Sequence, residues 1–582
     1  MTGQADHVDG RPQVSRGARG GEKEDSPESK TNDNDSCSIV IVDPSSDASD
    51  ESDDKEDADG PPRELPFSKA RSIALVATLT GASFLNTLCN QAVVIILPTI
   101  GRDLDIPDSR LQWIVSAYAL TFGTFLLLWG RIADIVGKRD IFIWGSAFMA
   151  VTLIANPFMP NEITFDLFRG LQGLGAAANV PTAIGILGVT FPPGKAKNYA
   201  FSAYASGAPL GSVFGNLLAG LIASATTWKW VFGALGGLGL VVAVAGLIVI
   251  PPPPVSLAPA PSNNKMLALL QSVDWPGGFL VTTGLLALLF ALTEGNVVGW
   301  RTPWIAALIV VAVILLAVFF AWQWYQETHC STSRRPLMKA SLFLGNGRFC
   351  AGLAIMALFF ASFNNFLVYA TYFYQDYQGL GPLQTTLRFV PTGVTGLAVA
   401  FAVSHLISRV PTWVLLLCGN GAVSVSCLLF AVPLPPSTSY FAFGLPAFVL
   451  SVVGADCTWP CLTLFTSRSL PQEDQAMGGG LINASAAVGR AIGLAIDTAL
   501  QTAVLARQRG VPVERSGKIE LWDQASVTSI RAANWFNFAL AVFCMGVVSV
   551  AFRGTGIVGK SYAKPTEKSD GVAKGSGRSG DV

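Results

Sequence analysis

The sequence predicts an all-α membrane protein whose chain crosses the bilayer fourteen times. Two observations support this class. Of the 582 residues, 51% are hydrophobic and 13% are charged, whereas soluble proteins carry about 25% charged residues. The apolar residues also lie in long blocks rather than in stripes along amphipathic helices, and a block of about 20 apolar residues is long enough to span a bilayer as one helix.

Each predicted span is one of these apolar blocks, and short polar segments separate them. In chain order the expected spans are 72–100, 111–130, 141–157, 163–190, 199–224, 230–250, 275–293, 303–324, 349–373, 387–407, 412–432, 440–465, 476–504 and 535–552.

Several function classes have no support in the sequence. The formal net charge is zero, so bulk charge says nothing about a nucleic-acid partner, and we expect none. The nine cysteines are scattered without paired spacing, which predicts neither a disulfide framework nor a zinc site. No Walker A motif is present, so ATP is not expected to be the direct energy source. No catalytic Ser/His/Asp or metal constellation is found either, so we predict a protein that is not an enzyme and has no cofactor or metal.

The two ends of the chain differ in charge. Residues 1–71 are polar and include an acidic, serine-rich run at 45–60, a composition that cannot bury enough apolar area to fold. We interpret them as a solvated cytosolic tail, with a dedicated binding segment as the alternative. Lys and Arg in the short loops place both termini in the cytosol, including the basic tail 554–582. The loop 506–533 disagrees with this orientation, but earlier helices usually dominate.

Two breaks divide the spans into groups of six, two and six. A proline run at 251–261 predicts a stiff linker, and the mixed apolar and basic segment at 327–348 predicts an interfacial helix. The expected parts are an N-terminal bundle (72–251), a linker (252–274), two extra spans (275–326), a connector (327–348) and a C-terminal bundle (349–553).

The loop between the second and third spans concentrates charge between two apolar blocks. It reads GRIADIVGKR over residues 130–139. Its glycines would let helices approach closely, its arginine and aspartate at i and i+3 can share a helix face, and its two basic residues favour the cytosol. We interpret this segment as a conformational latch formed by Gly130, Arg131, Asp134, Gly137, Lys138 and Arg139.

This loop resembles the signature loop of the major facilitator superfamily, in which the same residue types recur at these spacings. The resemblance implies that Asp134 faces the start of a helix in the other half, near 477–480, and latches the outward-open state; a helix N-terminus favours a carboxylate. The segment SHLISRVPTW at 404–413 echoes the loop in degraded form, with Ser404, His405 and Ser408 in place of Gly130, Arg131 and Asp134. Two duplicated halves, which form the major facilitator fold, are therefore expected.

Two further segments resemble motifs of exporters. The segment FDLFRGLQGLGAAANVP at 165–181 is similar to the fourth-helix motif of proton-coupled exporters and contains Arg169. An arginine inside a span normally faces a polar interior; the alternative is an arginine that snorkels to the interface. The segment ASGAPLGSVFGNLLAG at 205–220 resembles the fifth-helix antiporter motif through Gly207, Pro209 and Gly211, although it lacks the usual Gly-Pro step. Simple packing is the alternative for these glycines.

The additional spans point to one branch of the superfamily. Residues 272–300 and 374–396 resemble the fourteen-helix drug:proton antiporters. The first span departs from that pattern, since Cys89 stands where many members carry an aspartate, and proton coupling cannot use that carboxylate.

The resemblance implies a central cavity lined by spans one, four, nine and twelve. We expect these residues to form the substrate cavity: Asn86, Asn90, Gln172, Asn179, Asn364, Asn365 and Trp459. Hydrogen bonds between helices are the alternative role for the asparagines. Arg169 and Asp456 are the candidates for proton coupling, because a buried carboxylate without a fixed cation can titrate near neutral pH; a permanent ion pair is the alternative for Asp456. Arg490 and Asp497 are expected to make packing or interface contacts.

These observations and the resemblance predict a proton-coupled efflux transporter that works by alternating access. It would export small hydrophobic or amphipathic compounds, such as drugs, toxins or secondary metabolites, as a monomer driven by the proton gradient. The resemblance and the acidic tail suggest a fungal pump in the plasma membrane, with the vacuolar membrane as the alternative. An uptake carrier or uniporter, and a transporter-like sensor that signals through its tail, remain open.

Overall fold

The computed structural model describes residues 68–106, 110–252, 272–329, 336–435 and 437–558. Fourteen of the described helices are long and apolar enough to cross a membrane, which confirms the predicted number of spans. No strand occurs in these ranges. The predicted tails and the proline-rich linker fall mostly outside the described residues.

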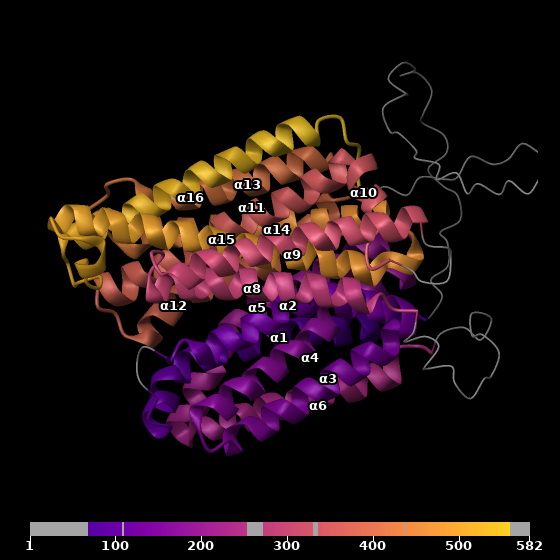
Figure 1. Ribbon diagram of the computed structural model, residues 1–582, viewed down its shortest axis with the longest axis horizontal. Helices are drawn as coiled ribbons and strands as arrows, with labels where there is room; N and C mark the ends of the chain where they lie inside the picture. The colour runs from indigo at the N-terminus through magenta and orange to yellow at the C-terminus, as the bar shows by residue number, and fades with distance from the viewer. Residues whose placement is uncertain (1–67, 107–109, 253–271, 330–335, 436, 559–582) are drawn as a thin grey trace, which may run out of the picture. The chain divides into compact units, whose positions relative to one another are not determined.

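The helices form two bundles of six and an additional pair (Figure 1). The N-terminal bundle contains α1 (Lys69–Asp103), α2 (Trp113–Val136), α3 (Lys138–Ala155), α4 (Glu162–Thr190), α5 (Lys195–Ala225) and α6 (Trp228–Val249). The extra pair is α8 (Trp275–Val298) and α9 (Pro303–His329). The C-terminal bundle contains α11 (Gly347–Tyr372), α12 (Pro382–Leu406), α13 (Thr412–Ala431), α14 (Tyr440–Ser469), α15 (Gln475–Arg509) and α16 (Gln524–Ala551).

Short helices lie at several ends of these spans. They are η1 (Asn156–Phe158), α10 (Ala340–Gly345), η3 (Phe373–Tyr377), η4 (Gln472–Asp474) and η5 (Val513–Arg515). In the described part of the expected interfacial helix at 327–348, α9 continues to His329, the six-residue helix α10 follows, and α11 already begins at Gly347. Residues 330–335 of that connector lie outside the described residues.

Polar side chains and one glycine define helix ends. Asn161 accepts a hydrogen bond from the amide of Thr164 at the start of α4, and Asp523 accepts bonds from two amides at the start of α16. These caps satisfy amides that have no partner within the helix. Gly137, with φ of 135°, makes the turn between α2 and α3, a backbone conformation that favours glycine.

Close packing inside each bundle depends on small residues. A Cβ atom at Gly207 of α5 would lie 2.7 Å from the backbone oxygen of Thr80 in α1, so only glycine permits this approach. In the C-terminal bundle, Gly493 of α15 packs directly on Ala361 of α11 in the same way. Backbones approach closely because membrane helices associate through van der Waals packing rather than through the hydrophobic effect.

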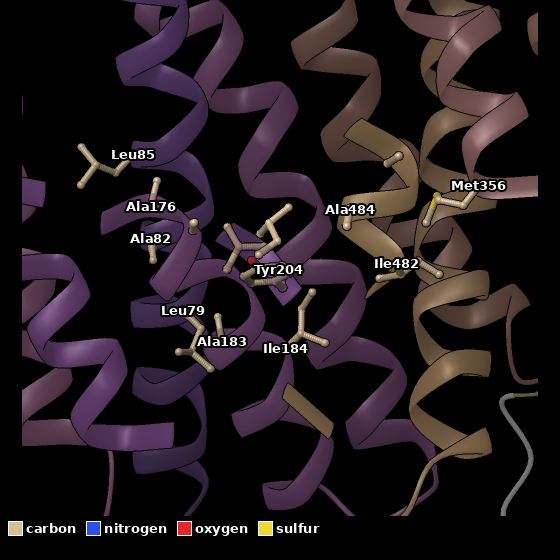
Figure 2. Close-up of a cluster of buried hydrophobic side chains, with 14 of the residues drawn as sticks. Leu79, Ala82, Leu85, Ala176, Ala183, Ile184, Tyr204, Met356, Ile482 and Ala484 are labelled. Carbon is tan, nitrogen blue, oxygen red and sulfur yellow. The ribbon is translucent and has the colours of Figure 1, made fainter. Parts of the chain in front are cut away.

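The two bundles contact each other through α2 and α4 against α15, and through α5 against α12 and α14. Figure 2 shows apolar side chains from both bundles within one buried cluster: Leu79, Ala82, Leu85, Ala176, Ala183, Ile184, Tyr204, Met356, Ile482 and Ala484.

The extra pair packs against both bundles, since α8 contacts α2 and α15. Asp274, buried just before α8, holds the pair together: it accepts hydrogen bonds from the side chains of Trp322, Gln323 and Gln326 on α9. It also caps α8 through the amide of Gly277. Buried polar groups of this kind are stable when they are hydrogen-bonded.

Candidate transport site

The predicted latch residues lie where α2 meets the start of α15. We call this end of the bundles, where α2 ends and α15 begins, the latch end. Asp134 accepts hydrogen bonds from the backbone amides of Ala476 (3.1 Å) and Met477 (2.7 Å) in α15. Its side chain is 1% exposed and also pairs with Lys138 at 2.7 Å. The carboxylate therefore satisfies free amides at a helix N-terminus, where the helix dipole favours negative charge.

A second ionic contact joins the bundles beside Asp134. Arg131 donates to Asp474 across the interface at 2.6 Å, and both side chains are buried. Lys339, just before α10, lies 3.9 Å from the other oxygen of Asp474. A Cβ atom at Gly130 would lie 2.7 Å from the backbone oxygen of Ala476, so glycine is needed for this close approach. The latch is thus an ionic and hydrogen-bonded junction between the two bundles.

The remaining predicted latch residues stay within the N-terminal bundle. Arg139 donates hydrogen bonds to the backbone oxygens of Ile250 (2.9 Å) and Leu247 (3.0 Å), at the end of α6. Gly137 forms the turn and Lys138 supports Asp134. Two of the six residues, Gly130 and Asp134, therefore contact α15, Arg131 contacts Asp474 just before it, and the other three organise the loop. Asp474 was not among the predicted residues, because neither the loop motif nor the resemblance implied a partner for Arg131.

The degraded second loop also reaches across to the other bundle. His405 at the end of α12 lies 2.7 Å from the hydroxyl of Tyr199 in α5, and the two rings meet edge to face at 5.1 Å. Because the second loop corresponds to the first in the two duplicated halves, this contact lies where a second latch is expected. It is a tyrosine–histidine hydrogen bond instead of an ion pair.

Arg169 lies at the centre of a polar cluster within the N-terminal bundle. Its side chain is 0% exposed, so it does not snorkel to the surface. It donates to the backbone oxygen of Ile114 (2.8 Å) and to the side chain of Gln172 (2.7 Å). The guanidinium carbon also lies 4.9 Å from the centre of the Tyr118 ring, and the Tyr118 hydroxyl donates to Asn86. Two predicted cavity residues are thereby gathered around Arg169.

The other predicted cavity residues occupy different surroundings. Asn179 donates to Ser146 of α3 at 3.0 Å, which is a contact between neighbouring helices. Asn365 is buried without a hydrogen-bond partner in the described part of the chain. Asn90 and Asn364 are half-buried. Trp459 of α14 stacks on Tyr204 of α5 at 5.7 Å, across the interface between bundles.

The predicted antiporter residues divide between two contacts. Gly207 and Gly211 face the backbone of α1, where a Cβ atom would clash. Pro209 instead faces α12, since a Cβ atom at Gly396 would lie 3.2 Å from it. The glycines therefore hold α5 on α1, while the proline lies against the other bundle.

Asp456 is a buried carboxylate without a compensating cation. Its side chain is 4% exposed, and its Oδ2 atom has no hydrogen-bond partner within the described ranges. No basic side chain of those ranges lies within 4.0 Å of it. A permanent ion pair with a described residue is therefore not formed.

A second buried acid, Asp497 of α15, lies in the C-terminal bundle. It accepts a hydrogen bond from Asn537 of α16 at 2.8 Å, and its other oxygen has no partner among the described residues. Arg490, seven residues earlier, lies over the Phe360 ring at 5.4 Å instead. The signal for Asp497 was present in the sequence, because a carboxylate inside an apolar span is costly and usually functional.

The described residues contain no group of three or more His, Cys, Asp or Glu side chains that could hold a metal ion. The arrangement thus combines the latch, a junction between bundles that a conformational change can break, with several buried polar groups that can bind a ligand.

Comparisons with known proteins agree with this geometry. The family model "Major Facilitator Superfamily" matches residues 79–293 and 257–494. The chain belongs to the Major Facilitator Superfamily. It is a multi-pass membrane transporter of a family whose members carry small molecules.

Relatives within the superfamily have different stated functions. The "Low affinity ammonium transporter" of Saccharomyces cerevisiae is 31% identical over 76% of this chain and 84% of its own length. The "Efflux pump terJ" of Aspergillus terreus is 28% identical over 75% of this chain and 83% of its own length. The solved proton:xylose symporter XylE, at 12% identity and a TM-score of 0.55 over 84% of this chain and 98% of that chain, shares the fold.

Proposed function

We propose that the protein is a proton-coupled antiporter of the fourteen-helix drug:proton branch that exports small hydrophobic or amphipathic compounds by alternating access. The observation that carries this proposal is Asp456, a buried carboxylate with no cation beside it among the described residues. Such a group gains a proton when it is closed off and can lose it when the bundles move and admit water. Relatives named as efflux pumps support export.

In this mechanism the latch controls which side opens. The contacts of Asp134 and Arg131 hold the bundles together at the latch end, which is the predicted cytosolic end. Protonation of Asp456 and binding of the cargo then affect the opening at the end of the bundles opposite the latch. Arg169 is held by Ile114 and Gln172. Its positive charge would interact with any charge that enters the N-terminal bundle, and this interaction would couple cargo binding to the movement of the bundles.

The proposal includes the conditions in which the protein works. It acts as a monomeric transporter rather than as an enzyme, and it uses the proton gradient without a cofactor. We place it in the plasma membrane with both termini in the cytosol; the vacuolar membrane is the alternative. Drugs, toxins and secondary metabolites are the proposed cargo classes.

A second candidate is uptake of a small solute, and one comparison favours it specifically. The relative with 31% identity is named as an ammonium transporter, and Cys89 replaces the aspartate that many antiporters carry in the first span. Under this alternative the protein would move ammonium or a similar small cation inward.

The test measures both directions of transport in cells that lack their own pumps. Efflux of a panel of hydrophobic dyes and drugs is compared with uptake of labelled methylammonium, with and without a collapsed proton gradient. Asp456→Asn and Arg169→Ala should each abolish gradient-dependent efflux. Asp105→Asn is the matched control, since Asp105 is exposed in a turn with φ of 51° that asparagine tolerates.

Two results would overturn parts of the proposal, the first the role of Asp456 and the second the direction of transport. Efflux unchanged in Asp456→Asn would remove this carboxylate from the mechanism, and methylammonium uptake without dye efflux would favour the carrier. Deletion of residues 1–65 tests the sensor alternative, because transport should survive the loss of the tail.

A further inference from the structure

A cavity of about 290 Å³ lies at the end of the C-terminal bundle opposite the latch. It is bordered by η3 at the end of α11, by the first turns of α12 and α14, and by the loop between α15 and α16. We call it the Arg388 cavity. It is separate from Arg169 and Asp456 and belongs to a single bundle.

A guanidinium group forms the charged wall of this cavity. Arg388 lies over two aromatic rings, with its central carbon 4.5 Å from the centre of Tyr374 and 5.5 Å from that of Tyr440. One of its nitrogens donates to the side chain of Gln378 at 2.9 Å. No carboxylate within the described ranges lies within 4.0 Å of it. A guanidinium carries five N–H donors, and no carboxylate of the described ranges accepts from them.

The position of this arginine is fixed by its neighbours. The Tyr440 hydroxyl donates to the backbone oxygen of Arg388 at 2.6 Å and thus ties the start of α14 to α12. Both aromatic rings hold the guanidinium plane through cation–π contact. A preorganised cation of this kind loses little side-chain freedom when it binds an anion.

The opposite wall shows unusual backbone structure. Trp522 has a φ of 53°, and its amide donates to the backbone oxygen of Tyr377 at 3.1 Å. Tyr377 lies in η3, a π-helical turn of five residues. Positive φ at a bulky residue and π-helical turns both concentrate at functional sites, and here both position aromatic side chains beside the cavity.

We propose that the Arg388 cavity binds a small aromatic anion, a single planar ring that carries a carboxylate or sulfonate. A guanidinium pairs with such a group through two parallel hydrogen bonds, and the ring of the ligand stacks on Tyr440 and Trp522. Thr438 and Ser439 also line the cavity. Ligand cavities usually measure about 300–1,000 Å³, so this one suits one ring rather than a large drug.

The inference does not depend on the proposed export, because binding is measured without transport. The probe is 4-fluorobenzoate, followed by fluorine NMR with the purified full-length protein in nanodiscs. Saturable binding is expected. The uncharged 4-fluorobenzyl alcohol should bind at least about tenfold more weakly, since it lacks the charge-assisted hydrogen bonds.

Variants identify the residue responsible. Arg388→Gln should weaken 4-fluorobenzoate binding about tenfold or more, and Arg388→Lys should lose part of that affinity because it keeps the charge but not the planar fork. Arg515→Gln is the matched control. Arg515 is an exposed arginine on the loop between α15 and α16, and it does not line the cavity. The affinity of this variant for 4-fluorobenzoate should stay within twofold of wild type.

The outcomes separate clearly. Equal binding of the acid and the alcohol, unchanged binding by Arg388→Gln, or no saturable binding by the wild type would each overturn the proposal. If Arg388→Gln does not fold, as judged by gel filtration and thermal unfolding, Arg388→Lys and Trp522→Leu decide: unchanged affinity in both would refute the site.

Discussion

The replacement of Asp134 by asparagine tests whether the latch controls the conformation. The substitution preserves size and one acceptor oxygen but removes the charge that faces two amides of α15 and Lys138. The loss of one charge-assisted hydrogen bond costs about 1.5–3 kcal/mol, and the lost interaction with the helix dipole adds up to about 1–2 kcal/mol in a buried site. The latched state should therefore lose about 2–4 kcal/mol relative to the open state.

This energy corresponds to a large shift in population, because each 1.4 kcal/mol changes an equilibrium about tenfold. A latched-to-open ratio should thus fall by about 30-fold to several hundredfold. Spin labels at Asp140 and Arg409, two exposed residues at the latch ends of different bundles, report the separation of the bundles by double electron–electron resonance. Asp134→Asn should transfer most of the distance distribution from the short to the long separation.

Arg139→Gln is the matched control in the same loop. Among the described residues, the hydrogen bonds of Arg139 go to backbone oxygens at the end of α6, in its own bundle, and it forms a long pair with Asp140 at 3.7 Å. The inter-bundle distances should not change in this variant. If Asp134→Asn gives the wild-type distribution, or if Arg139→Gln gives the same shift, the latch is not the element that holds the bundles together.

Three further predictions concern packing, the extra pair and pH. Gly130→Ala should open the latch, because its Cβ atom would lie 2.7 Å from the Ala476 oxygen; the same distance measurement checks this. Asp274→Asn should lower the thermal unfolding midpoint, since four hydrogen bonds to a buried carboxylate weaken by about 2 kcal/mol in total; an unchanged midpoint contradicts it. The hydrogen bond from Arg509 lowers the pKa of Asp523 to about 2. Its stabilising effect is present above the unfolded value of about 3.9 and disappears as the pH falls through 2, so acid unfolding curves of wild type and Asp523→Asn should differ above pH 4 and converge towards pH 2.

The sequence predicted the number of spans because bilayer thickness alone determines the length of an apolar block. The resemblance of the loop to the superfamily's signature motif implied that Asp134 faces the start of a helix near 477–480, and the observed amides are those of Ala476 and Met477. Neither the motif nor the resemblance implied a partner for Arg131, so its pairing with Asp474 was not predicted. Such a side-chain pairing depends on how the two bundles pack in three dimensions.

The cavity residues show a second limit of sequence reasoning. Asn86 and Asn179 lie in spans that the resemblance implied to line the cavity, yet Asn86 contacts Tyr118 beside Arg169 while Asn179 faces Ser146 of α3. Asn86 is half-buried and Asn179 is buried, and the difference between their contacts depends on the rotation of each helix against its neighbours. That rotation is set by packing in three dimensions, which one sequence does not determine.

The two junctions between the bundles differ in strength, and the additional helices lie on the stronger side. On one side, Arg131 pairs with Asp474 in a buried ionic contact, whereas on the other side the partly exposed Tyr199 and His405 share one hydrogen bond. Breaking a buried pair costs several kcal/mol, while exposed contacts contribute about 1 kcal/mol or less. The extra helix α8 contacts both α2 and α15, and Lys339 of the connector lies near Asp474. Since separation of α2 from α15 must also disturb α8, the extra pair is placed to influence the opening of the latch end.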